Sequence, residues 1–220
     1  MKDRVLSGVT LVAFFMAIVV FNRSFPLALN IAIAFISALA VFEVIEALEL
    51  SDRWYITVPS MTAAVLVQFC EFQQANIFIY SAFTACIFCA LLRHHREITF
   101  KEMAVVYSMV VLIPLALQTI VLVRTLSDQH GMFYALVCVF SAWIPDAGAF
   151  FAGKLFGKHK LCPEISPKKT VEGAIGGVLG TMVFGVVATL IYSVAADRME
   201  AFTRSNIGVS MYVIIALLGC

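Results

Sequence analysis

The segment from residue 143 to residue 177 reads WIPDAGAFFAGKLFGKHKLCPEISPKKTVEGAIGG. It joins the end of one apolar run to the start of the next through a short stretch rich in lysine. An apolar run of roughly 17–25 residues can cross a bilayer as a helix, whereas clustered charges stay in water. The segment therefore indicates two membrane helices joined by a polar loop at one membrane surface.

The composition of the whole chain supports this interpretation. Of the 220 residues, 62% are hydrophobic and 13% are charged, against about 45–50% and about 25% in soluble domains. These proportions exclude a soluble globular domain and indicate a membrane protein. The net charge of +1 provides no overall basic field, so we expect no nucleic-acid partner.

The apolar runs predict an all-α fold, a polytopic transmembrane protein with seven complete spans and a truncated eighth. We expect a single membrane domain over residues 1–220, in which residues 1–131 hold the N-terminal spans and residues 132–220 begin the catalytic region. The eighth run stops after about 21 Å of helix, so we expect the chain to be truncated there. The predicted spans are Val5–Phe21, Pro26–Leu48, Tyr55–Phe69, Ile77–Leu92, Phe100–Val123, Met132–Phe151, Val171–Ala195 and the run from Ile207 onward.

The lysines and arginines predict the orientation of the spans. Sorted by alternate loops, eleven of the fifteen fall on the side of the N-terminus and four on the other side. Cytoplasmic loops carry the excess of positive charge in membrane proteins. We therefore expect the N-terminus and the 154–169 loop to face the cytoplasm.

One acid lies within the sixth predicted span, near its cytoplasmic end. A carboxylate in hydrocarbon costs a few kcal/mol unless it meets water, a metal ion or a cation. Helical spacing puts Asp146, Phe150, Gly153 and Gly157 on roughly one face, where small residues would let a ligand approach. We predict a functional carboxylate at Asp146, and the alternative is a helix-end residue beside Pro145.

Lysines dominate the loop that follows, because Lys154, Lys158, Lys160, Lys168 and Lys169 place five positive charges at the membrane surface. They would bind phosphate groups, or would only anchor the loop to anionic lipid headgroups.

Ser166 and Pro167 are typical of a helix start, with Ser166 as the N-cap and Pro167 in the first turn. The lysines that follow and Thr170 would then line a helix N-terminus, where free N–H groups and the helix dipole favour phosphate. Glu172 would order a lysine or meet a metal ion.

The seventh predicted span contains two pairs of glycines four residues apart, Gly173 with Gly177 and Gly176 with Gly180. Such pairs let helices approach closely in lipid. They would form either an intramolecular contact or the interface of a homodimer.

The motifs of residues 146–177 closely resemble bacterial phosphatidate cytidylyltransferase, also called CDP-diacylglycerol synthase. They read D-x-G-A-F-F-A-G, F-G-K-x-K-L and I-S-P-K-K-T-V-E-G-x-x-G-G in this chain. The resemblance implies an inner-membrane nucleotidyltransferase of phospholipid biosynthesis. It would use CTP, phosphatidic acid and Mg²⁺ and release CDP-diacylglycerol and pyrophosphate.

We predict the following roles on this basis. Asp146, Lys168 and Lys169 are expected to be catalytic, and Asp146 to bind the metal. Glu43, at the cytoplasmic end of the second span, is a weaker metal candidate or an interfacial acid. The residues expected to bind substrate phosphates are Lys154, Lys158, Lys160, Ser166, Thr170, Glu172 and Gly173.

A second signature of that family, with histidine-glycine-glycine and aspartate-arginine-x-aspartate, does not occur in this sequence. Asp197 and Arg198 are followed by Met199 and Glu200 and do not replace it. We therefore expect the main metal ligands in a missing C-terminal segment, and little activity from residues 1–220 alone.

Other functions fit parts of the sequence. An enzyme of similar architecture could use another lipid phosphate as acceptor. A small transporter could use Asp146 and the cytoplasmic glutamates along a path, and a truncated, inactive relative could bind lipid phosphate.

Overall fold

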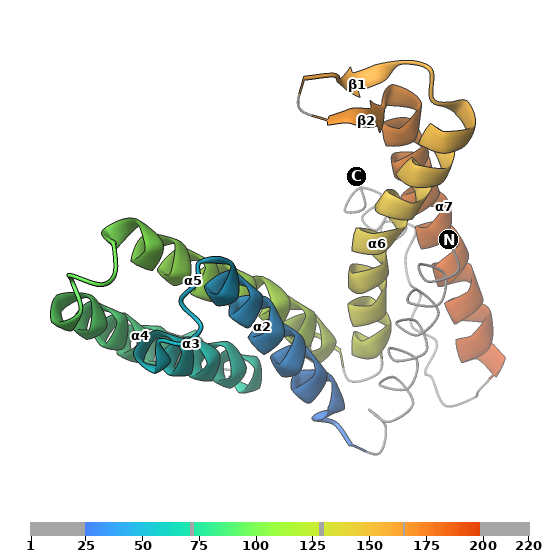
Figure 1. Cartoon of the computed structure of the whole chain (residues 1–220). Helices are drawn as coiled ribbons and strands as arrows, with labels where there is room; N and C mark the ends of the chain where they lie inside the picture. The colour runs from blue at the N-terminus through green and yellow to red at the C-terminus, as the bar shows by residue number, and fades with distance from the viewer. Residues whose placement is uncertain (1–24, 71–72, 128–129, 165, 199–220) are drawn as a thin grey trace. The chain divides into compact units, whose positions relative to one another are not determined.

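The computed structural model of the chain describes residues 25–70, 73–127, 130–164 and 166–198. The chain folds as two compact units, Met1–Thr125 and Leu126–Cys220. Each unit has its own packing and is described by itself. In Figure 1 the first unit contains the helices coloured from blue to green, and the second contains those coloured from yellow to red.

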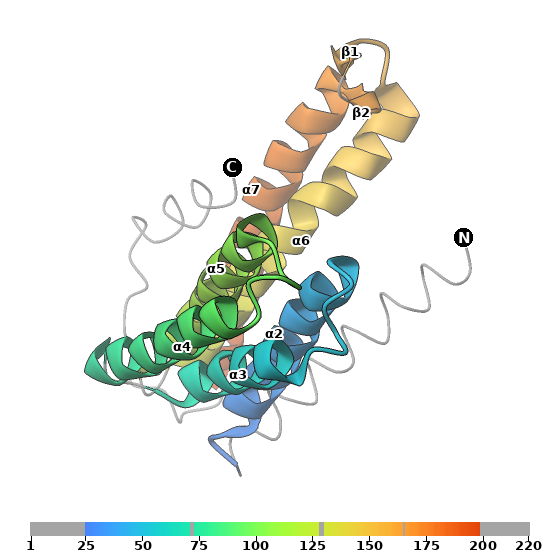
Figure 2. The same cartoon turned by 60° about the vertical axis from the view of Figure 1, so that its left-hand side comes forward.

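The first unit is a bundle of apolar helices. Its described elements are α2 (Ala28–Ala47), α3 (Trp54–Leu66) with the short 3₁₀ helix η1 (Val67–Phe69), α4 (Gln73–Arg93) and α5 (Phe100–Thr125). Helix α2 packs against α3 and α5, and α3 packs against α4 (Figure 2). The buried core of the unit includes Val41, Ile45, Ile56, Ala64, Val106 and Val110.

Helix α3 and the 3₁₀ helix that follows it are together too short to cross a full bilayer. Buried side-chain amides donate hydrogen bonds to the backbone carbonyls at this end of α3. Backbone carbonyls at a helix end inside a membrane need partners. The Nε2 of Gln118 on α5 donates to the carbonyl oxygens of Val67 and Cys70, at 2.7 Å each. The Nδ2 of Asn30 on α2 donates to the carbonyl oxygen of Gln68 at 2.8 Å. These hydrogen bonds provide partners for the backbone at the irregular end of α3 inside the bundle.

The second unit is a helical hairpin with a β-hairpin at one end. Helix α6 (Gly131–Phe156) and helix α7 (Val171–Arg198) lie side by side, and strands β1 (Lys160–Cys162) and β2 (Ser166–Thr170) connect them (Figures 1 and 2). The strands are antiparallel. Polar residues and Pro163 fill this connection, which explains why neither helix continues through it.

The helices agree with most of the predicted spans. Five described helices are long and apolar enough to cross a membrane, namely Ala28–Ala47, Gln74–Arg93, Phe100–Thr125, Gly131–Phe156 and Val171–Tyr192. The third predicted span forms a shorter apolar helix, Trp54–Phe69. The first and eighth predicted spans lie outside the described residues. The structure thus confirms a predominantly helical membrane protein, and the predicted total of seven and a partial eighth stays a prediction.

Two local predictions are wrong. The 154–169 region contains a β-hairpin where a plain loop was expected, so the described fold is not purely helical. Ser166 and Pro167 lie in β2, and the helix begins at Val171. The serine-proline pattern misleads because Thr170 offers a competing cap with the same chemistry, immediately before the apolar run.

Candidate active site

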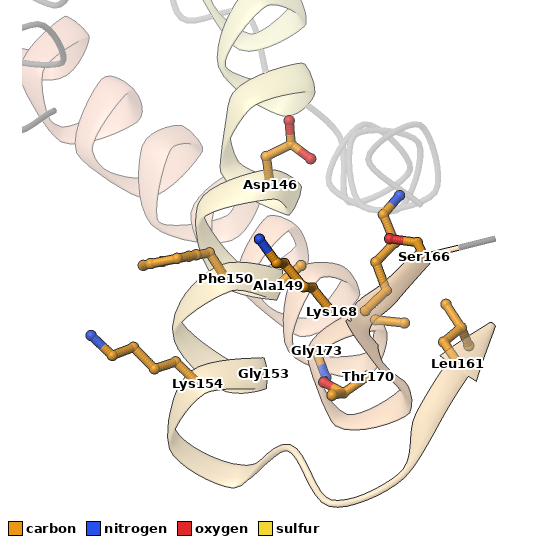
Figure 3. Close-up of a pocket in the computed structure, with 12 residues that line it drawn as sticks. Asp146, Ala149, Phe150, Gly153, Lys154, Leu161, Ser166, Lys168, Thr170 and Gly173 are labelled. Atoms are coloured by element: carbon orange, nitrogen blue, oxygen red, sulfur yellow. The ribbon is translucent and has the colours of Figure 1, made fainter. Parts of the chain in front are cut away.

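A pocket of about 590 Å³ opens between α6, the β-hairpin and the first turn of α7. All of its walls belong to the second unit. Figure 3 shows the pocket and the side chains around it. Its lining residues are Asp146, Ala149, Phe150, Gly153, Lys154, Leu161, Ser166, Lys168, Lys169, Thr170, Gly173 and Ala174.

Helix α6 supplies the acidic and aromatic wall. Asp146, Phe150 and Gly153 all line the pocket, in agreement with the predicted shared face, whereas Gly157, the fourth residue of that prediction, lies beyond the end of α6 and does not line the pocket. The Nζ of Lys154 lies 6.0 Å from the ring centroid of Phe150, within the range of a cation–π contact. The wall therefore combines one carboxylate with a half-exposed aromatic ring and a lysine.

Strand β2 supplies the basic wall. Ser166, Lys168 and Lys169 line the pocket, and both lysines are exposed. Figure 3 shows the side chain of Lys168 extending from β2 toward α6, whereas that of Lys154 points away from β2. Exposed ammonium groups on a short strand beside a carboxylate suit a polyanionic ligand, because they donate hydrogen bonds and neutralise its charge.

The start of α7 forms the floor of the pocket. The backbone N–H of Gly173 donates to Oγ1 of Thr170 at 3.1 Å, so Thr170 caps the helix. A Cβ added to Gly153 would lie 2.9 Å from that Oγ1, and one added to Gly173 would lie 2.9 Å from the carbonyl oxygen of Ala149. A side chain at either position would therefore force its neighbours to move, and the two glycines let the backbone of α7 approach α6 at the pocket.

Seven of the predicted site residues line one pocket, and the others do not line it. Asp146, Lys154, Ser166, Lys168, Lys169, Thr170 and Gly173 line one pocket. Lys158, Lys160 and Glu172 do not line it. Glu43 is exposed on α2, in the other unit.

Glu172 binds a residue that the sequence did not single out. Its Oε1 lies 2.7 Å from Nδ1 of His159, and the backbone N–H of His159 also donates to the carboxylate. His159 precedes β1, and no periodic spacing connects it with Glu172. Only the antiparallel pairing of β1 with β2 brings the two residues together, so a sequence pattern had no means of indicating this contact.

The glycines of α7 make an intramolecular contact. A Cβ on Gly177 would lie 2.9 Å from the carbonyl oxygen of Pro145, and one on Gly148 would lie 2.8 Å from that of Gly176. Gly176 also faces Ala152 of α6. Of the two alternatives that the glycine pairs left open, the described residues show the contact within one chain.

The pocket fits part of a magnesium site. Asp146 is the single acid among its lining residues, and in the described part of the chain no three His, Cys, Asp or Glu side chains cluster to hold a metal ion. Mg²⁺ commonly binds one or two carboxylates and takes its other oxygens from substrate phosphates and water. Asp146 alone can therefore provide one ligand for an ion that arrives with a phosphate substrate.

Comparison with known proteins points to the same chemistry. The model of the cytidylyltransferase family matches residues 2–220. The phosphatidate cytidylyltransferase of Bacillus subtilis (strain 168) is 28% identical over 203 residues, which cover 87% of this chain and 72% of that protein. That of Aquifex aeolicus (strain VF5) is 38% identical over 95 residues, covering 37% of each chain.

A further relative shares a shorter segment at higher identity. The phosphatidate cytidylyltransferase of Staphylococcus aureus (strain COL) is 46% identical over 55 residues, which are 25% of this chain and 21% of that protein. The matched segment thus spans well under half of the Aquifex and Staphylococcus proteins. Because the family model matches nearly the whole length, and the motifs of the pocket indicate the same enzymes, the chain belongs to the cytidylyltransferase family.

Proposed function

We propose that this protein transfers a cytidylyl group from CTP to phosphatidic acid, giving CDP-diacylglycerol and pyrophosphate. The observation that carries the proposal is that Lys168, Lys169 and Asp146 line one pocket beside two apolar helices. One substrate is dissolved in lipid and the other in water, so the reaction needs a site at the membrane surface. The named activity of the relatives supports the same substrates.

The reaction joins two phosphates, and each partner is an anion. An oxygen of the lipid phosphate attacks the α-phosphorus of CTP, the bond from this phosphorus to the bridging oxygen breaks, and pyrophosphate leaves. Lys168 and Lys169 would hold the phosphate oxygens and balance the charge of the leaving pyrophosphate. Ser166 and Thr170 would add hydroxyl groups that orient the same oxygens.

Magnesium belongs to the proposal as a partner of the nucleotide. When bound, Mg²⁺ withdraws charge from the phosphoryl oxygens and makes the phosphorus easier to attack. Asp146 would hold the ion from the α6 side of the pocket, at the helix face opposite the lysines of β2. Its carboxylate would also keep the lysine side chains oriented before the nucleotide binds.

The orientation in the membrane is also part of the proposal. CTP is cytosolic, so the pocket must open on the cytoplasmic side of the bacterial inner membrane. The excess of lysine and arginine on that side supports this orientation. Lys158 and Lys160 lie outside the pocket wall and are suited to bind anionic headgroups beside it.

Substitution of the β2 lysines tests the phosphate role. In the complete gene product, Lys168→Ala and Lys169→Ala should each lower the turnover of CTP by about 10–100-fold, because each removes a charged hydrogen-bond donor worth about 1.5–3 kcal/mol. Lys101→Ala is the matched control, since Lys101 is exposed on α5 and lies outside the pocket. Wild-type turnover in either β2 variant would contradict the role of that lysine.

A further inference from the structure

The β-hairpin provides one wall of the pocket, although its own strand pairing is weak. Lys160 pairs with Thr170 and Cys162 pairs with Ser166, and the register shifts between these two positions. Pro167, the second residue of β2, has no N–H to donate. A two-stranded hairpin is marginally stable at best in water. Contacts outside the ladder must therefore fix the hairpin to the helix pair.

Glu172 and His159 make such a contact at the base of the hairpin. The Nδ1 of His159 lies 2.7 Å from Oε1 of Glu172. The backbone nitrogen of His159 lies 3.2 Å from each of the two carboxylate oxygens of Glu172, to which its N–H donates. A carboxylate only accepts hydrogen bonds, so Nδ1 carries the proton in this pair. The backbone N–H of Val171 donates to the carbonyl oxygen of His159 at 3.0 Å and closes the same junction.

The carboxylate of Glu172 is turned toward this junction and not toward the ligand space. Neither Glu172 nor His159 lines the pocket. The side chain of Glu172 is 24% exposed and that of His159 is 79% exposed, so the carboxylate is the more buried partner of the pair. We therefore expect this pair to influence catalysis through the hairpin whose base it holds.

We propose that Glu172 and His159 form a clamp that fixes the start of β1 to the first turn of α7 and so holds the hairpin in place, with Lys168 and Lys169 of β2 on the pocket wall opposite Asp146. Both are positioning residues, and their effect on turnover rests on the proposed function. Glu172 lies on the first turn of α7, which is fixed to α6 through Gly173 and Gly177. The clamp thus fixes the weakly paired hairpin to the closely packed helix pair.

A double-mutant cycle distinguishes a clamp from a direct contact with substrate. In the complete gene product, Glu172→Ala should raise KM for CTP and lower kcat, with a combined loss in kcat/KM of about tenfold, because both donors of His159, the backbone N–H and Nδ1, lose their acceptor. His159→Ala should cost about threefold, since it removes only the exposed ring contact.

The double variant should be no worse than Glu172→Ala, because both substitutions break one contact. His159→Asn, which keeps a side-chain donor, should recover part of the loss. If the two losses multiply, Glu172 acts on substrate or metal by itself, and the clamp is wrong. Glu164→Ala is the control, because Glu164 is an exposed acid of the same hairpin that does not line the pocket.

Hydrogen–deuterium exchange tests the clamp without using activity. Peptides that cover residues 158–171 should exchange about tenfold faster in Glu172→Ala than in the wild type or in Glu164→Ala, because the N–H of His159 loses its acceptor. Unchanged exchange would overturn the clamp. Faster exchange in a protein that makes no CDP-diacylglycerol would support the clamp and contradict the proposed function, so the two can fail separately.

Discussion

Gly177 lies where a side chain of any size would meet the backbone of the neighbouring helix. A Cβ on Gly177 would lie 2.9 Å from the carbonyl oxygen of Pro145, which is fixed within α6. Three residues further along α7, a Cβ on Gly180 would have ordinary contacts of 3.8 Å to Gly148 and 3.9 Å to Ile144. The two glycines therefore differ in what they do, although their sequence context is similar.

This difference gives a prediction for two alanine substitutions. Gly177→Ala should push α6 and α7 apart and destabilise the protein by about 1–3 kcal/mol, the usual cost of overpacking. Gly180→Ala should be neutral or stabilise by up to about 1 kcal/mol, because alanine favours a helix over glycine. Thermal unfolding of the purified protein in detergent measures both. Equal melting temperatures for the two variants would contradict the helix contact.

The sequence predicted which single residues lie together where they recur at helical spacing on one face of a helix. Asp146, Phe150 and Gly153 recur at helical spacing, and they line the same pocket. Prediction from sequence failed where the chain leaves the helix. The contact of His159 with Glu172 depends on the pairing of two short strands, and neither composition nor periodicity reports such a pairing.

At the scale of single elements, α3 shows how a short helix is supported inside an apolar bundle. The carbonyl oxygens of Val67 and Cys70 at its end both accept from Gln118, whose Oε1 in turn accepts from Nδ2 of Asn76 at 2.8 Å. Gln118 is 2% exposed. Without this side chain, the Cys70 carbonyl and the Asn76 amide would lose their partner in an apolar surrounding, and the Val67 carbonyl would keep only the backbone N–H of Cys70.

Substitution of Gln118 tests this role. Gln118→Leu should destabilise the protein by about 1–3 kcal/mol or more, because it leaves buried polar groups unpaired. Gln74→Leu is the control, since Gln74 is exposed at the start of α4. Unfolding in detergent, followed by loss of the helical circular-dichroism signal, compares the two. A Gln118→Leu protein as stable as the control would show that the amide bonds do not support α3.

The apolar runs predicted the elements better than they predicted their ends. Hydropathy located the described helices, because lipid-crossing length is a property of the run itself. It did not indicate that α3 would stop after thirteen residues and continue as a 3₁₀ turn. That end depends on Asn30 and Gln118, which lie on other helices.

At the scale of the whole molecule, the predicted orientation places the β-hairpin in the cytoplasm and the connection between α5 and α6 on the outer side. Cys162 is an exposed thiol on β1, and Ser127 lies in that connection. In a protein with Cys162 as its only cysteine, a membrane-impermeant maleimide should label inverted vesicles and not right-side-out vesicles. Ser127→Cys in a cysteine-free protein should show the opposite pattern. Labelling of both sites from the same side would contradict the orientation.

The central claim concerns the reaction, and its most direct test is product formation. Membranes that contain the complete gene product should convert CTP and phosphatidic acid, with Mg²⁺, into CDP-diacylglycerol and pyrophosphate in equal amounts. Membranes with the Bacillus subtilis relative provide a reference for the assay. CDP-diacylglycerol that appears only when both CTP and phosphatidic acid are supplied is the predicted result. No product from this protein, in an assay where the relative is active, would contradict the proposed function.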